Sequence, residues 1–129
     1  MNDPAKGHIL VLEDDDAYRR LVVRILKGAG FDVLEARDFA SAIALVEGAQ
    51  RIDLLLADIG MPAQTPQGMS IARMSQIRRH GLKTVYMTGG DAKACAFYAN
   101  GETVLQKPFT AAVLVEAVSA VLGRREHAS

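Results

Sequence analysis

Five polar or charged side chains directly follow runs of apolar residues, and their types suit the binding of a metal ion and a phosphoryl group. Glu13 and Asp14 follow the run ILVL, Asp58 follows LLLA, and Thr88 and Lys107 follow two later runs. Carboxylate oxygens are ligands that Mg²⁺ prefers. A hydroxyl and an ammonium group are donors that can stabilise the oxygens of a phosphoryl group during transfer. Together they predict metal-assisted phosphoryl chemistry, provided that the fold brings them to one place.

The elements that must position these residues are predicted as alternating strands and helices. Runs rich in Val, Ile and Leu predict five strands, over 8–12, 31–35, 52–57, 84–87 and 103–106. After each strand the apolar residues recur at helical spacing or, over 91–99, form a short Ala-rich segment. This alternation favours an α/β fold with a parallel sheet covered by helices on both faces. Ligands of such sheets bind beyond the carboxyl ends of the strands, where all five side chains fall.

Residues that begin and end helices support this order. Asp38 and Thr110 precede apolar helical patterns as N-caps, and Gly30 and Gly123 follow the first and last patterns as stops. The third helix is expected from about residue 67, after an irregular loop that contains two prolines. Of the acids that follow the first strand, Asp15 and Asp16 are assigned to the start of the first helix, with Asp16 as its cap.

Each candidate residue also has a purely structural explanation. Acids after a strand commonly cap the next helix, where the helix dipole favours negative charge. The sequence TGG at 88–90 is compatible with an ordinary turn, and KPFT at 107–110 with a helix entry. Asp58 could end its strand only because Met61 and Pro62 begin a loop. The functional interpretation rests on all of them falling at one edge of the predicted sheet.

Composition limits the classes of protein and partner. The 129 residues suit one domain, which we place at 8–123, with tails at 1–7 and 124–129 and no output domain. Fifteen basic residues balance fifteen acidic ones, so no cationic surplus favours nucleic acid or anionic lipid. No apolar run approaches the roughly 20 residues that span a bilayer, and we expect a cytoplasmic protein. A single cysteine, Cys95, excludes an internal disulfide and a cysteine metal cage.

The sequence resembles the receiver domain of bacterial response regulators, the phospho-acceptor half of two-component signalling. The motifs that carry the resemblance are ILVLEDD, LLLADIGMP, VYMTGG and VLQKPF, in this order, and the resemblance extends from about residue 8 to residue 122. It implies a flavodoxin-like doubly wound (βα)5 fold with a five-stranded parallel sheet in the order 2-1-3-4-5.

The resemblance implies a metal site and a phosphoryl acceptor. Asp58 would accept the phosphoryl group and also bind the metal, as the Asp before x-x-Met-Pro does in the family. Asp14 would ligate Mg²⁺ or Mn²⁺ directly, Glu13 would help through water, and Gly60 would offer its backbone carbonyl.

It also implies how the phosphoryl group is held and where it comes from. Thr88 would hydrogen-bond one phosphoryl oxygen and Lys107 would pair with another, and the Lys107–Pro108 peptide bond is expected to be cis. The donor would be a histidine kinase or a histidine phosphotransfer protein. The chain would not be an enzyme beyond its own phosphotransfer and slow dephosphorylation, and it would signal by changing its binding to a downstream protein.

Three positions depart from the family pattern. The family usually has an aromatic residue three positions before the lysine, and this sequence has Val104. The loop after Met61 and Pro62 is longer than usual, as either a tolerated insertion or a partner contact. Gly60 and Gly90 stand two positions after the aspartate and the threonine, so neither can orient a hydrolytic water with a side chain. Dephosphorylation should then depend on solvent access or on a partner phosphatase.

Other classes of function stay open at this point. The chain could be an adaptor with a receiver fold that does not use phosphate, although it keeps Asp14, Asp58, Thr88 and Lys107. It could also be a fragment of a longer regulator or hybrid kinase. A nucleotide-binding or flavin-binding enzyme of the same topology is disfavoured, because G-x-G-x-x-G and G-x-x-x-x-G-K-[ST] are missing and the first strand ends in acids that repel phosphate.

Overall fold

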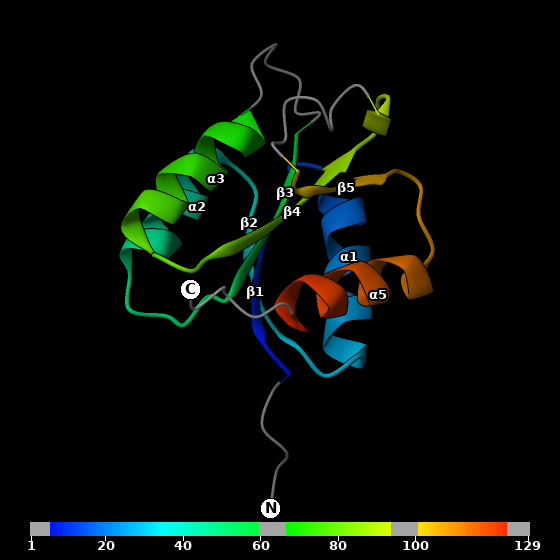
Figure 1. Cartoon of the computed structure of the whole chain (residues 1–129), viewed down its shortest axis with the longest axis horizontal. Coiled ribbons are helices and arrows are strands. Elements are labelled where there is room, and N and C mark those ends of the chain that lie inside the picture. Colours follow the sequence, from blue (N-terminus) through cyan, green and yellow to red (C-terminus); the bar gives the residue numbers. More distant parts are fainter. Residues whose placement is uncertain (1–5, 60–66, 94–100, 124–129) are drawn as a thin grey trace, which may run out of the picture.

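A computed structural model describes residues 6–59, 67–93 and 101–123 and shows one parallel sheet with helices on both faces (Figure 1). Its five strands lie in the order β2-β1-β3-β4-β5, which confirms the predicted fold class and strand order. The strands are β1 His8–Leu12, β2 Asp32–Ala36, β3 Leu54–Asp58, β4 Lys83–Thr88 and β5 Thr103–Gln106. The helices are α1 Asp16–Gly28, α2 Phe39–Glu47, α3 Gln67–Arg78 and α5 Ala111–Gly123.

Pairing between strands decides where each strand ends. The predicted bounds of β1 and β5 are confirmed, whereas the other three strands differ from the prediction by one or two residues. β3 and β4 each continue one residue further, because Asp58 pairs with Met87 and Thr88 pairs with Gln106. Both polar residues are therefore the last residues of buried strands, where the backbone is held by the sheet.

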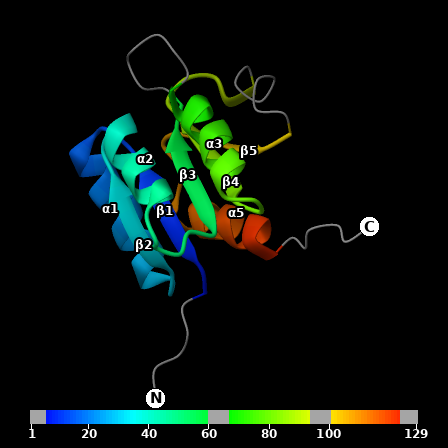
Figure 2. The same cartoon turned by 90° about the vertical axis from the view of Figure 1, so that its left-hand side faces the viewer.

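Alternating strand residues build two apolar layers, one on each face of the sheet. On one face, Leu10, Leu55 and Tyr86 pack with residues of α2 and α3. On the other face, Val11, Leu56 and Met87 pack with residues of α1 and α5. Figures 1 and 2 show these two helix pairs on opposite sides of the sheet. Successive strand residues point to opposite faces and both faces are covered, so β1, β3 and β4 are buried almost throughout.

The helix caps confirm two predictions and correct one. The Asp38 carboxylate accepts a hydrogen bond from the Ser41 amide, and the Thr110 hydroxyl accepts one from the Val113 amide. The prediction that Asp16 caps α1 is wrong, because the cap is Asp15, whose carboxylate accepts the Tyr18 amide at 2.9 Å. A capping side chain reaches the amide two or three residues ahead, and the helix begins directly after Asp15.

Some predicted features lie outside the described residues. These are the loop at 60–66 with Gly60, Met61 and Pro62, most of the fourth predicted helix with Cys95, residues 1–5 of the first tail and the second tail, 124–129. Among the helices that the structure describes, none has the length and apolar character needed to cross a bilayer.

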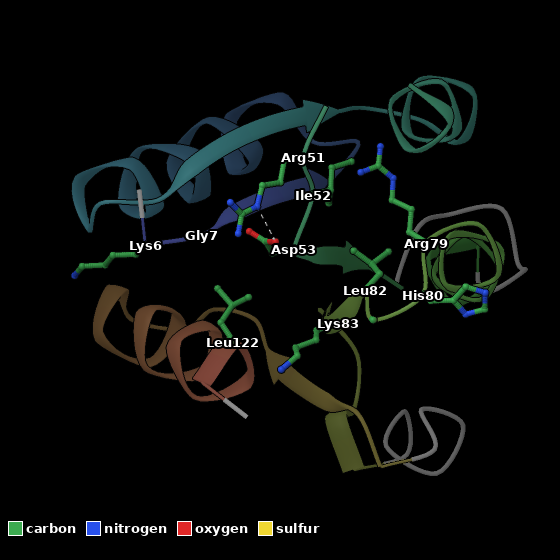
Figure 3. A pocket seen from close by; sticks show the side chains of 11 residues that line it. Lys6, Gly7, Arg51, Ile52, Asp53, Arg79, His80, Leu82, Lys83 and Leu122 are labelled. Carbon is green, nitrogen blue, oxygen red and sulfur yellow. Dashed lines mark hydrogen bonds and ion pairs between the residues drawn. The ribbon is translucent and has the colours of Figure 1, made fainter. Parts of the chain in front are cut away.

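The opposite edge of the sheet holds a basic hollow of about 330 Å³ (Figure 3). Arg79 donates hydrogen bonds to the carbonyl oxygens of Val46, Gly48 and Gln50 at 2.9, 2.9 and 2.6 Å. Lys83 donates to the carbonyl oxygen of Val121, in the last turn of α5, at 3.2 Å. In a parallel α/β fold this edge collects the carboxyl ends of the helices, which carry partial negative charge. These two basic side chains therefore stabilise helix ends.

Arg79 predicts a measurable stability effect. Arg79→Met removes the donor to three carbonyls in and just after the last turn of α2, so we expect the free energy of unfolding to fall by about 1–3 kcal/mol. Arg79→Lys should recover only part of the loss, because an ammonium group lacks the planar fork of a guanidinium group. Urea denaturation measures this. Arg24→Met, at an exposed position on α1, is the matched control and should change stability by less than about 0.5 kcal/mol. Equal effects of the two Met variants would contradict this role.

Candidate functional site

The parallel strands deliver the predicted site residues to one edge. Leu12 of β1 pairs with Ala57 of β3, so the next residues, Glu13 and Asp58, lie at the same level. Backbone hydrogen bonds continue the sheet beyond the paired residues: the Ile59 amide donates to the Met87 carbonyl at 2.9 Å. The backbone that carries Glu13 and Asp58 is thus hydrogen-bonded to neighbouring strands at this edge.

Three carboxylates meet at this edge. Glu13, Asp14 and Asp58 each offer one oxygen, and the three oxygens lie within 4.8 Å of one another. The side chains of Glu13 and Asp58 are buried, with residue exposures of 1% and 4%, whereas Asp14 is exposed. Hard oxygen ligands at such spacing suit a divalent cation, with the open side at Asp14 left for water. The acidic cluster could therefore hold a metal.

The Lys107 ammonium group balances the two buried carboxylates. It forms an ion pair with the Glu13 carboxylate and lies 3.3 Å from Oδ2 of Asp58. Burial lowers the pKa of Lys107, but the hydrogen bond to Glu13 and the charge of Asp58 outweigh it and leave the pKa raised. Lys107 is therefore a fixed positive charge beside Asp58.

Burial makes Glu13 reluctant to ionise. Desolvation is the largest effect on its pKa, the negative charge of Asp58 adds to it, and the hydrogen bond to Lys107 opposes both. The pKa of Glu13 rises from 4.5 to about 7. Without a cation, the site therefore favours one proton on this carboxyl group at mildly acidic pH.

Thr88 and Lys107 are joined through the backbone. The Lys107 amide donates to the Thr88 carbonyl at 2.7 Å, which fixes the end of β5 to the end of β4. Thr88 is buried at 2% exposure, and its hydroxyl accepts the Gly90 amide at 3.0 Å. The peptide bond between Lys107 and Pro108 is cis, as expected. The hydroxyl therefore lies at the carboxyl end of β4 and is linked to the loop that follows.

Two positions singled out in the sequence, Val104 and Gly60, do not form part of this cluster in the described residues. Val104, where the family usually has an aromatic residue, is half-buried and pairs with Tyr86 of β4 in the sheet register. Gly60, predicted to offer a carbonyl to the metal, lies outside the described residues.

The structure also adds two residues that sequence reasoning missed. Arg19 donates to the Glu13 carbonyl at 2.9 Å and also binds Asp16 and Glu35, so it holds the loop that carries Asp14. The ring of Tyr18 lies under the Lys107 ammonium group. In the sequence, Tyr18 is one apolar residue of a helical pattern, and Arg19 is the first of two arginines that follow it. Neither contact has a signal in the spacing, because both depend on how α1 packs.

Comparisons with known proteins point to one family. Residues 9–119 match the family model described as the response regulator receiver domain. The chain is 33% identical over 126 residues to the transcriptional regulatory protein CseB of Streptomyces avermitilis, covering 95% of this chain and 52% of that protein. It is also 33% identical over 117 residues to the response regulator receiver protein CpdR of Brucella abortus, covering 88% of this chain and 95% of that protein.

A solved structure supports the same assignment. The crystal structure of a response regulator receiver protein from Sinorhizobium medicae is similar with a TM-score of 0.81 and 32% identity, over 93% of this chain and 97% of that one. The chain spans about half the length of CseB, which it matches in sequence. On the family model and these relatives, the chain belongs to the response regulator receiver domain family, whose members are signalling phospho-acceptors of two-component systems.

Proposed function

We propose that residues 8–123 form a receiver domain that accepts a phosphoryl group on Asp58. One observation carries the proposal: a buried carboxylate ends a central strand, 3.3 Å from a lysine ammonium group and within a cluster of acids suited to a cation. Phosphoryl transfer relies on positioning and charge neutralisation, and both are present here. An adaptor that never uses phosphate would gain nothing from burying these charges together.

The transfer follows from the groups beside Asp58. A carboxylate oxygen of Asp58 attacks the phosphorus of a phosphohistidine, the new P–O bond forms as the P–N bond breaks, and the leaving imidazole takes up a proton. Lys107 offsets the charge on the equatorial oxygens, since its raised pKa keeps it protonated. Water can later attack the acyl phosphate and restore Asp58, so the modification is temporary.

A divalent cation, Mg²⁺ or Mn²⁺, is the cofactor that the residues fit. We assign the direct ligands to Asp14 and Asp58, with Glu13 acting through water, and Gly60 remains a proposed carbonyl ligand outside the described residues. When bound, the cation supplies positive charge to the phosphoryl oxygens. Asp14 is exposed, which leaves the cation a side open to water and to the incoming phosphate.

We further propose a cytoplasmic protein that receives phosphate from a histidine kinase or a histidine phosphotransfer protein and acts on a downstream protein, without binding nucleic acid itself. The supporting chemistry is the acceptor site and the absence of net charge, with 15 basic and 15 acidic residues. The phosphoryl group would draw the Thr88 hydroxyl from the Gly90 amide, which links the site to the following loop. With Val104 in place of an aromatic residue, the output should not use an aromatic side chain at that position.

The acceptor role is tested with a small phosphodonor. Incubated with acetyl phosphate and Mg²⁺, the protein should gain the mass of one phosphoryl group, because Asp58 is the carboxylate at the end of a central strand that lies beside both the ammonium group and the acidic cluster. Asp58→Asn should abolish the gain, and Asp32→Asn, at an exposed position, should keep it. Intact-protein mass spectrometry measures both. An unmodified wild-type protein, with this donor and with kinases alike, would leave the adaptor role as the better account.

The raised pKa of Glu13 predicts a specific pH dependence. Between 4.5 and about 7 the folded protein holds a proton that the unfolded chain has released. The free energy of unfolding should therefore fall as pH rises through this window, by at most about 3 kcal/mol, in the absence of divalent cations. Urea titrations at several pH values should show this fall in the wild type and in Glu116→Gln, on the exposed side of α5, but not in Glu13→Gln.

The same proton should be displaced by the metal. A carboxylate must be ionised to assist a cation, so Mg²⁺ binding below about pH 7 should release a proton, and the affinity should rise with pH up to that value. Calorimetry in two buffers of different ionisation enthalpy counts the released protons. A proton count unchanged in Glu13→Gln would show that another group is responsible.

Gly90, two positions after Thr88, should control how long the acyl phosphate lasts. A side chain at Gly90 would begin 3.5 Å from the Thr88 hydroxyl oxygen, an ordinary contact, and would cover the approach to it. We expect Gly90→Leu to slow loss of the phosphoryl group at least threefold, or about 0.7 kcal/mol in the barrier. Gly89→Leu is the matched control, since a side chain there meets nothing within 4 Å. The decay is followed by mass spectrometry, and equal decay in the two variants would rule out control by access at Gly90.

A further inference from the structure

The Lys107 ammonium group has an uncharged partner besides its two carboxylates. It lies 4.5 Å from the centroid of the Tyr18 ring. This distance is well within the roughly 6 Å over which the face of an aromatic ring attracts a cation. The Lys107 side chain is only 18% exposed, so water weakens this attraction less than at an open surface.

The Tyr18 ring is itself held by two separate parts of the chain. At its backbone, the Tyr18 amide binds the Asp15 cap, which fixes the residue in the first turn of α1. At its ring, Phe109 packs edge-on, with centroids 5.8 Å apart and an interplanar angle of 75°. The ring thus joins the start of α1 to the segment that follows Lys107.

The two carboxylates around Lys107 do not keep one role during the reaction. Asp58 is the proposed acceptor, and Glu13 is the proposed outer ligand of the cation, so both change their bonding when cation and phosphate arrive. The Tyr18 ring has no such second task. It is the contact of Lys107 that can persist while the ammonium group moves from a carboxylate to a phosphoryl oxygen.

We propose that Tyr18 is a positioning residue for phosphoryl transfer, acting through Lys107 by holding the ammonium group against the face of its ring. This inference rests on the proposed function, because it concerns the same site. It assigns Tyr18 no contact with the phosphoryl group itself. The effect should therefore disappear when Lys107 is removed.

A double-mutant cycle tests the coupling. With acetyl phosphate and saturating Mg²⁺, we expect Tyr18→Leu to slow phosphorylation roughly 3- to 10-fold, whereas Tyr18→Phe, which keeps the ring face, stays within about twofold. In a Lys107→Met background, Tyr18→Leu should cause no further loss. Leu21→Ala, at an exposed position on the same helix, is the matched control and should leave the rate unchanged. Circular dichroism checks folding, and Tyr18→Met replaces Tyr18→Leu if the latter does not fold.

A second readout does not depend on phosphate. In NMR spectra the ε-methylene protons of Lys107 should be shifted upfield by the ring in the wild type and in Tyr18→Phe, and the shift should be lost in Tyr18→Leu. The proposal is overturned if Tyr18→Phe is as slow as Tyr18→Leu, if the loss persists without Lys107, or if the shift is lost while the rate is unchanged. If the wild type is never phosphorylated, the proposed function fails, whatever the NMR shift shows.

Discussion

Two buried carboxylates that share one ammonium group are the constraint around which the carboxyl edge of this sheet is built. Glu13 and Asp58 are almost fully buried. Burying a pair of negative charges costs folding free energy unless an opposite charge lies beside them. Lys107, the residue directly after β5, supplies that charge, and the exposed Asp14 leaves room for a cation to supply more. The negative charge of the three acids is therefore only partly offset by Lys107, and a bound cation would offset more of it.

The rest of the fold holds the two carboxylates and the ammonium group in place. Three of the strands are buried along almost their whole length, because helices cover both faces of the sheet. Consequently the polar residues at the carboxyl ends of these strands are held by backbone that is paired in the sheet. On the opposite edge, Arg79 and Lys83 satisfy the carboxyl ends of helices, so the basic residues there have a structural explanation. One edge of the sheet thus stabilises helix ends, and the other gathers the acids and the lysine of the candidate site.

The sequence was sufficient to predict the fold and most of the site, for reasons that particular residues make clear. The motifs at Asp58 and Lys107 combine an apolar strand with a polar end, and such a pattern depends only on local order along the chain. The predicted cap Asp16 was wrong by one residue, because the exact start of a helix depends on which amide the cap side chain reaches. Tyr18 and Arg19 were missed, since their contacts are set by the packing of α1 against the loop ends, and no spacing in the sequence reports that packing.

The ion pair between Lys107 and Glu13 joins residues separated by 94 positions in the chain. During synthesis, the three acids are all present once β3 has been made, long before the lysine has emerged. The compensating charge arrives only when the last strand docks beside β4, because the Lys107 amide must find the Thr88 carbonyl. The charges of the candidate site are therefore complete only after the last strand has joined the sheet.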